Sequence, residues 1–167
     1  MDRLWSPWRL EYVTRGDTQT GCIFCPADAS AEAAQRESLI VFRGTTCHII
    51  LNLYPYNNGH VMVVPYRHTA SFATLSREEL HEMADLVQRS ETALHAAYHP
   101  HGLNVGVNLG TPAGAGVLEH VHMHMVPRWN GDTNFMTVIG ETRVLPEELQ
   151  SSARKLRPIF EKLNVPR

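Results

Sequence analysis

The most constraining feature of this chain is the stretch His-Val-His-Met-His-Met-Val-Pro at residues 120–127. Successive side chains of an extended strand point to opposite faces, so the histidines are predicted to share one face and the apolar residues between them the other. A strand face that seeks burial carries Val or Ile, because a neutral imidazole still needs a hydrogen-bond partner in the core. We therefore expect one face of this strand to pack on the core and the other to bind or react. The reactive face comprises His120, His122 and His124.

Length and composition indicate a single domain over residues 1–167. A chain of 167 residues, 43% of them hydrophobic, can bury one sizeable core, whereas two independent domains would be cramped. The formal net charge of -2 and the absence of a Lys/Arg run argue against a nucleic-acid partner. No apolar run approaches the ~20 residues that a membrane span needs, and the first residues do not resemble a signal peptide. We expect a cytoplasmic protein without a membrane partner.

Hydrophobic periodicity predicts an α+β fold with an antiparallel sheet of about five strands. The separators between the apolar runs are short and contain turn residues, which favours antiparallel neighbours. The strictly alternating run at 103–109 is typical of a half-buried strand. The expected strands are 39–42, 47–53, 60–64, 103–109 and the histidine strand, with a further apolar segment at 136–139.

One long helix is expected to be the scaffold. Ser76 and Glu79 have the spacing of a capping box, and apolar residues then recur at helical spacing until Pro100 and Gly102 end the pattern. The sequence therefore predicts a helix over 76–98 that carries the sheet.

The two terminal segments are also expected to be helical. The N-terminal segment 1–20 is rich in aromatic residues, and a short docking helix is predicted over 4–13. The small residues at 27–34 predict a weak helix. A C-terminal helical segment is expected at 141–167, with Pro158 interrupting or ending its helix.

The cysteines indicate metal or redox chemistry rather than a disulfide framework. The chain has three cysteines, which is a small and odd number for such a framework. In a reducing compartment, a Cys-x-x-Cys pair more often has metal or redox chemistry. Cys22 and Cys25 have metal-ligand spacing, whereas Cys47 stands alone before an apolar run and is expected to be a small buried hydrophobe.

Three interpretations of the histidine strand compete. All three histidines could hold a catalytic zinc with an open position for water. Alternatively, His120 could join Cys22 and Cys25 in a closed structural zinc site, with His68 as the candidate fourth ligand, which would leave His122 and His124 free of metal. The third interpretation is a surface strand whose histidines have no function.

The glycine-rich loop before the strand favours the divided site. Residues 110–116 are Gly-Thr-Pro-Ala-Gly-Ala-Gly, and backbone amides in such a loop can form an anion-binding concavity. A phosphate held there would lie against the histidines. A neutral imidazole can attack phosphorus to give a covalent intermediate, and a neighbouring ring can transfer protons near neutral pH. The combination predicts phosphoryl or nucleotidyl transfer.

His-x-His-x-His followed by apolar residues resembles the signature of the histidine triad superfamily of nucleotide hydrolases and transferases, and the similarity runs from about Cys22 to Asn134. The resemblance implies that His122 is the nucleophile toward the nucleotide α-phosphate and that His124 contacts the phosphate or assists the leaving group. His60, in a Gly-His at the start of a strand, would be a further catalytic histidine. Asn52 would bind the ribose, and Asn108 would point toward the phosphates.

The same resemblance implies a zinc site. Some members bind zinc through a Cys-x-x-Cys pair, a histidine in a Pro-x-x-His segment and the first histidine of the triad. All four ligands have counterparts here, and the expected cofactor is one structural zinc ion. The counterparts are Cys22, Cys25, His68 and His120.

The phosphate loop departs from the pattern of the family. Many members have Gln, Ser or Thr a few residues before the triad, where this chain has only small or apolar side chains. Backbone amides are therefore expected to bind the phosphates. The expected nucleotide-binding positions in this loop are Gly114, Ala115, Gly116 and Val117.

The segments that flank the motif are similar to the bacterial branch linked to diadenosine tetraphosphate phosphorylases. The expected substrate is a dinucleoside polyphosphate, cleaved through a nucleotidyl-histidine that inorganic phosphate or water resolves, and the resemblance implies a homodimer. The alternatives are a nucleoside phosphoramidase or general nucleotide hydrolase, a metal-dependent hydrolase and, from another class, a nucleotide-binding interaction module without turnover.

Overall fold

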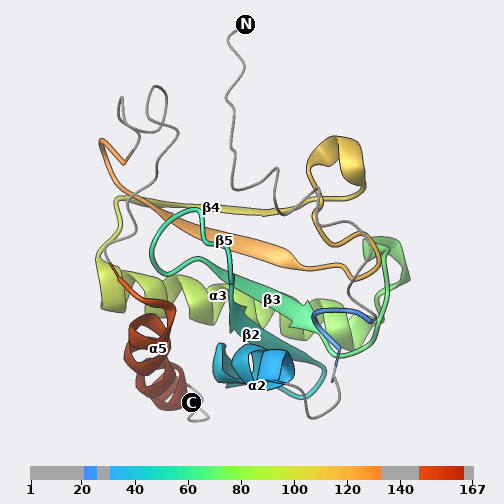
Figure 1. Cartoon of the computed structure of the whole chain (residues 1–167), viewed down its shortest axis with the longest axis horizontal. Coiled ribbons are helices and arrows are strands. Elements are labelled where there is room, and N and C mark those ends of the chain that lie inside the picture. The colour runs from blue at the N-terminus through green and yellow to red at the C-terminus, as the bar shows by residue number, and fades with distance from the viewer. Residues whose placement is uncertain (1–20, 26–30, 133–146, 164–167) are drawn as a thin grey trace, which may run out of the picture.

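The computed structural model describes residues 21–25, 31–132 and 147–163. Its centre is a five-stranded sheet in the order β1-β2-β3-β5-β4, in which every neighbouring pair is antiparallel (Figure 1). This confirms the predicted fold class and the expected number of strands. The strands are β1 (Ile40–Arg43), β2 (Cys47–Leu51), β3 (Val61–Pro65), β4 (Gly102–Val107) and β5 (Met123–Arg128).

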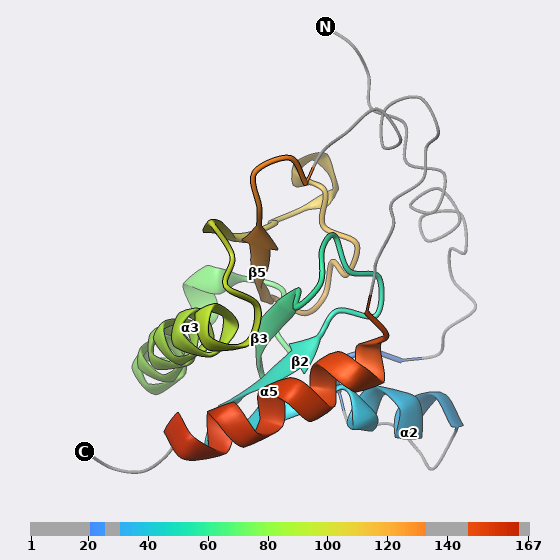
Figure 2. The same ribbon diagram turned by 90° about the vertical axis from the view of Figure 1, so that its left-hand side faces the viewer.

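The long helix α3 (Arg77–Tyr98) packs against β2, β3 and β5 on one face of the sheet (Figures 1 and 2). The predicted capping box is present: the Ser76 side chain accepts from the Glu79 amide, and the Glu79 carboxylate accepts from the Ser76 amide. All residues of β2 and β3 are buried, as expected for central strands. The core therefore lies between α3 and the middle of the sheet.

The C-terminal helix α5 (Leu149–Leu163) packs beside α3 and against β1. Pro158 was predicted to interrupt or end this helix, and that prediction is wrong, since the helix continues for five residues beyond it. Pro158 lacks the amide that would bond to the residue four positions earlier. Leu156 and Phe160 on either side of it are fully buried, and their packing outweighs the missing hydrogen bond.

The histidine strand begins later than predicted. β5 starts at Met123, so only His124 lies within it, while His120 and His122 occupy the irregular segment just before it. The ladder ends there because Val107 is the last residue of β4 to pair and Pro65 of β3 has no amide to donate. The amide of Val121 instead donates to the Thr69 carbonyl, 2.7 Å away.

β4 is an edge strand of the sheet and is less covered than its alternating sequence predicted. Leu103 and Val107 are half-buried, but Val105 between them is 49% exposed. α3 covers the sheet only as far as β5 at this edge, so the apolar side of β4 remains partly open.

The remaining predicted elements are described only in part. The weak helix expected at 27–34 overlaps α2 (Ala31–Ser38), while residues 27–30 lie outside the described part of the chain. Two short 3-10 turns occupy Phe72–Thr74 and Thr111–Ala113. The docking helix expected at 4–13 and the apolar segment at 136–139 lie outside the described residues. Among the helices that the structure does describe, none is long and apolar enough to cross a membrane.

Candidate active site and metal centre

Four predicted metal ligands come together from three separate parts of the chain. The ligand atoms of Cys22, Cys25, His68 and His120 all lie within 4.8 Å of one another. Cys22 Sγ is 3.2 Å from His120 Nδ1, and Cys25 Sγ is 3.4 Å from His68 Nδ1. The donor atoms of a tetrahedral zinc site are roughly 3.3–3.8 Å apart, given its usual bond lengths. The cluster therefore has a composition and spacing that fit a metal ion.

The hydrogen bonding of His120 also suits a ligand role. Its Nε2 is 2.9 Å from the Pro65 carbonyl oxygen, which can only accept, so Nε2 carries the proton and Nδ1 presents its lone pair to the thiols. Metal-bound histidines are usually oriented in this way by their second nitrogen. Burial lowers the pKa of His120, which keeps the ring neutral and available as a ligand.

Without a cation, the surroundings of Cys25 favour its protonated thiol. Burial raises the pKa of Cys25, and the neighbouring Cys22 raises it further. A bound divalent ion reverses this preference, because a coordinating thiol is deprotonated. The donor set is therefore matched to a soft or borderline metal rather than to a free dithiol.

The segment that carries His68 is tied to the start of α3. Arg67 makes a two-pronged ion pair with Glu79, with distances of 2.9 Å from Nε and 2.7 Å from Nη2, and it also donates to the Thr74 carbonyl. Glu79 is also the capping residue of α3. One carboxylate therefore anchors both the helix and the segment that carries a metal ligand.

His122 is buried and has a defined tautomer. It is 4% exposed, and its Nδ1 lies 2.8 Å from the carbonyl oxygen of His120. Because a carbonyl only accepts, the Nδ1 proton donates to it and Nε2 has the lone pair. Burial lowers the pKa of His122, so the ring is neutral at physiological pH. This is the state in which an imidazole can act as a nucleophile.

His60 and His124 form a directional hydrogen-bonded pair. The Tyr56 amide donates to His60 Nδ1 over 3.1 Å, so the proton of the neutral His60 ring is on Nε2. That nitrogen is 3.0 Å from His124 Nδ1, which must then accept and leave the His124 proton on its own Nε2. The His124 ring stands edge-on to His122, with centroids 4.7 Å apart. A proton donor is therefore placed beside the predicted nucleophile.

Asn52 lies next to this pair. Its Nδ2 is 3.4 Å from His60 Nδ1, and its Oδ1 accepts from the Tyr54 amide. The structure thus places Asn52 close to the histidines, while its contact with a ribose stays a prediction.

Sequence reasoning did not single out the support of the loop between β2 and β3. Asn57 Nδ2 donates to the Pro127 carbonyl and to Asp132 Oδ2, both over 2.9 Å. Asp132 also accepts two hydrogen bonds from Arg128, and this guanidinium keeps the pKa of the Asp132 carboxyl far below its ordinary value. These contacts fix the turn that precedes His60 against the end of β5. They join residues about 70 positions apart, so no local pattern could have revealed them.

The glycine-rich loop is more internally bonded than predicted. The amides of Gly114 and Ala115 donate to the carbonyls of Thr111 and Gly110. Asn108 Nδ2 lies 3.5 Å from the Gly114 carbonyl, so it contacts the loop directly. Phosphate binding by Gly114 or Ala115 amides would require this turn to open. The nucleotide-binding roles of the predicted loop residues, including Gly116 and Val117, stay predictions.

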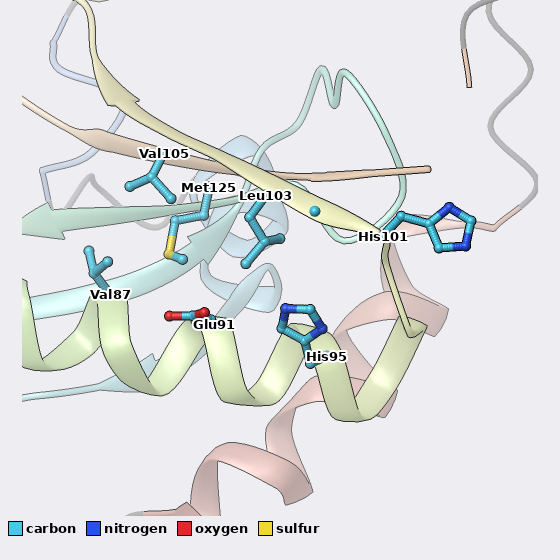
Figure 3. A pocket seen from close by; sticks show the side chains of 8 residues that line it. Val87, Glu91, His95, His101, Leu103, Val105 and Met125 are labelled. Atoms are coloured by element: carbon cyan, nitrogen blue, oxygen red, sulfur yellow. The ribbon is translucent and has the colours of Figure 1, made fainter. Parts of the chain in front are cut away.

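A separate groove of about 290 Å³ lies between α3 and β4 (Figure 3). Figure 3 shows Leu103 and Val105 of β4 facing Val87 and Glu91 of α3, with Met125 of β5 between them. Met125 and His124 are consecutive residues of β5, so their side chains point to opposite faces of the sheet. The groove is therefore on the helix side, away from the histidines.

Comparison with known proteins gives consistent similarities. The HIT domain family matches residues 33–131. An AP-4-A phosphorylase of Mycobacterium tuberculosis is 40% identical over 161 residues, which cover 93% of this chain and 83% of that protein. A bis(5'-adenosyl)-triphosphatase of Dictyostelium discoideum is 30% identical over 132 residues, 75% of this chain and 88% of that protein. A Zn-bound histidine triad family protein from Mycobacterium smegmatis superposes with a TM-score of 0.62 at 28% identity, covering 75% of this chain and 86% of that one.

Proposed function

The chain belongs to the HIT domain family, and from that premise we propose that it cleaves dinucleoside polyphosphates through a nucleotidyl-histidine on His122. The observation that carries the proposal is the set of contacts around these histidines, from which the position of each ring proton follows. His122 has a lone pair on Nε2, and the neighbouring His124 has a proton on Nε2. A nucleophile and a hydrogen-bond donor for the leaving oxygen thus meet in the protonation states that transfer requires.

The first step is attack of His122 Nε2 on the α-phosphorus of the substrate. The bond from that phosphorus to its bridging oxygen breaks, and the nucleoside polyphosphate leaves as an anion whose new terminal oxygen accepts a hydrogen bond from His124 Nε2. The Nδ1–H bond to the His120 carbonyl stabilises the positive charge that develops on the His122 ring. In the second step, an oxygen of phosphate or water attacks the same phosphorus, the bond from phosphorus to Nε2 breaks with its electron pair returning to His122, and the proton of an attacking water passes to solvent.

The names of the relatives support this substrate class. The 40%-identical relative is called an AP-4-A phosphorylase, and its match extends over most of both chains. We infer diadenosine tetraphosphate as the substrate and inorganic phosphate as the acceptor. Phosphorolysis would give ADP and ATP, whereas hydrolysis would give AMP and ATP.

We infer that the metal held by the four-residue cluster is zinc and that its role is structural. The Cys₂His₂ donor set suits zinc, and a closed four-ligand site has no open position for water. The Zn-bound neighbour from Mycobacterium smegmatis supports the choice of metal. The ion would cross-link the Cys22–Cys25 loop to the segments that carry His68 and His120.

We also propose a homodimer formed at β4. This strand is at the edge of the described sheet and presents the half-exposed side chain of Val105 beside the groove along α3. Edge strands with apolar side chains favour pairing with another chain. A second copy of β4 would extend the sheet and cover the groove.

The proposed function is tested by incubation with diadenosine tetraphosphate, with and without inorganic phosphate. We expect ADP and ATP when phosphate is present, and loss of turnover by about 10⁴-fold or more in His122→Ala with nucleotide binding retained. His81→Ala, on the exposed face of α3, is the matched control and should keep full activity. Near wild-type turnover by His122→Ala would overturn the nucleophile assignment.

The same experiment separates the alternatives. AMP and ATP in both buffers would indicate a hydrolase, and turnover of phosphoramidates alone would indicate a nucleoside phosphoramidase. Nucleotide binding without turnover of either substrate class would indicate a binding module. Loss of chemistry on chelation in a protein that remains folded would point to a catalytic metal.

A further inference from the structure

Phe24 lies between two metal ligands in the chain and against the nucleophile in space. It is the third residue of the Cys22–Cys25 loop, and its side chain is 8% exposed although both cysteines are only half-buried. Its ring centroid is 4.9 Å from that of His122, and 5.5 Å from that of His120 in an edge-on contact. The proposed metal chemistry and nucleotide chemistry do not themselves use this side chain.

The backbone of Phe24 is tied to the metal cluster. Its amide donates to Cys22 Sγ over 3.4 Å, so the position of the residue depends on the position of that sulfur. Cys22 Sγ in turn contacts His120 Nδ1. A metal ion that gathers these ligands would therefore also set the place of the Phe24 ring.

The nucleophile needs such support because the sheet does not hold it. The β5 ladder begins at Met123, so His122 lies outside it. Among the described residues, its ring has one hydrogen bond, from Nδ1 to the His120 carbonyl, and one such bond leaves the ring free to tilt about that axis. Two further rings contact His122: that of Phe24, at an interplanar angle of 46°, and that of His124, at an interplanar angle of 77°. Two of these three contacts come from the metal cluster and its loop.

We propose that Phe24 is a positioning residue for His122, and that the metal-binding loop acts on catalysis through it. Metal binding places Phe24 against one side of the His122 imidazole and holds His120, whose carbonyl fixes the Nδ1 proton. The lone pair on Nε2 is then aimed at the phosphorus before the substrate arrives. The proposal rests on the assignment of His122 as the nucleophile.

The test compares Phe24→Leu and Phe24→Met with Phe42→Leu as the matched control. The Phe42→Leu substitution removes the same ring. In the wild type, Phe42 packs on Phe160, at the opposite edge of the sheet from β4. We expect the Phe24 variants to retain the zinc content of the wild type and a KM within about twofold, while kcat falls about 10- to 100-fold, as a misaligned nucleophile predicts. Phe42→Leu should keep both constants.

A second measurement does not depend on activity. In ring-nitrogen NMR spectra of histidine-labelled protein, the His122 signals can be assigned by their absence from His122→Asn. We expect a single signal set with protonated Nδ1 in zinc-loaded wild type, and shifted or broadened signals in both Phe24 variants and after chelation. The effects of chelation and of the Phe24 substitutions on kcat should be less than additive, because they remove the same contact.

Unchanged kcat and His122 signals in a zinc-loaded Phe24 variant would overturn the proposal. A higher KM with unchanged kcat would also overturn it, since Phe24 would then be a substrate contact. If the wild-type protein turns over no dinucleotide, the proposed function fails, but the dependence of the His122 signals on Phe24 and on zinc still decides the positioning role.

Discussion

His60 Nε2 and His124 Nδ1 lie 3.0 Å apart, and the Tyr56 amide on the far side of His60 gives that bond its direction. A backbone amide can only donate, so a fixed peptide group sets the tautomer of His60 and, through it, that of His124. The proton on His124 Nε2 is therefore a consequence of backbone geometry. His60 is fully buried and acts behind the ring that would meet the substrate.

Removal of His60 should weaken the hydrogen bond from His124 to the leaving group without removing the nucleophile. His60→Ala leaves His124 Nδ1 without its donor, so the His124 proton is divided between the two nitrogens. We expect kcat for diadenosine tetraphosphate to fall by up to about 10²-fold, in the range for loss of one hydrogen-bond donor to developing charge. Steady-state kinetics check this, with His81→Ala as the control. An unchanged kcat would contradict the assigned direction of the pair.

Substitution of a metal ligand should lower both the bound zinc and the stability, whereas substitution of a core cysteine should lower the stability alone. Cys25→Ser is expected to lower bound zinc well below one equivalent and to reduce stability by about 3 kcal/mol when free zinc is at about 100 times its Kd. For a chain of this size that corresponds to a drop in Tm of about 6–12 °C. Elemental analysis and thermal unfolding measure the two effects. Cys47→Ala, which changes a fully buried cysteine outside the cluster, should lower Tm but retain full zinc.

The stability of the protein should depend on pH through His48. This side chain is 2% exposed and stacked on Tyr66, its Nδ1 has no partner among the described residues, and burial lowers its pKa to about 4. The unfolded chain has the ordinary histidine pKa of about 6.5. Between these values the unfolded state binds a proton that the folded state does not. His48 therefore does not lower the free energy of unfolding above about pH 6.5. Below that pH the free energy of unfolding falls progressively until about pH 4.

Urea unfolding at pH 7, 5.5 and 4.5 measures this loss. The contribution of His48 is at most about 1.4 kcal/mol for each pH unit within the window. His48→Phe keeps the stacked ring and should show a correspondingly shallower decline. The comparison between the two proteins cancels the acid sensitivity that the metal ligands share. Parallel declines would show that His48 binds a proton in the folded state as readily as in the unfolded one.

The proposed dimer should be sensitive to a charge at the edge of β4. Val105→Glu would place a carboxylate in an apolar interface, at a cost of a few kcal/mol and thus about 10²-fold or more in Kd. We expect the wild type to sediment as a dimer and this variant as a monomer in analytical ultracentrifugation. Ala96→Glu, at an exposed position on the side of α3 opposite Val87, adds the same charge away from the groove and should remain dimeric. A monomeric wild type would contradict the proposed interface.

Some features followed directly from the sequence because they depend on local periodicity and spacing. The alternation of apolar residues predicted the sheet, and the capping box from Ser76 to Glu79 predicted the start of α3. The set of metal ligands was also predicted by motif, and the structure brings those four residues together. The predicted end of α5 at Pro158 failed because local preference ignores the burial of Phe160.

The sequence was enough to name the candidate residues for the chemistry and to divide them between metal and nucleotide, since three alternating histidines and a Cys-x-x-Cys pair can be recognised along the chain. The folded structure was needed to show how these side chains are oriented and which nitrogen of each ring carries the proton. β5 begins only after His122, the Pro65 carbonyl orients His120, and the Tyr56 amide sets the direction of the His60–His124 pair. These assignments depend on hydrogen-bond partners as far apart in sequence as 55 and 64 residues, and on ring contacts such as that of Phe24 with His122. Chain folding alone brings such distant partners together. The backbone groups that set the tautomers of His122 and His60 are only two and four residues away, but whether they contact the ring depends on the folded backbone.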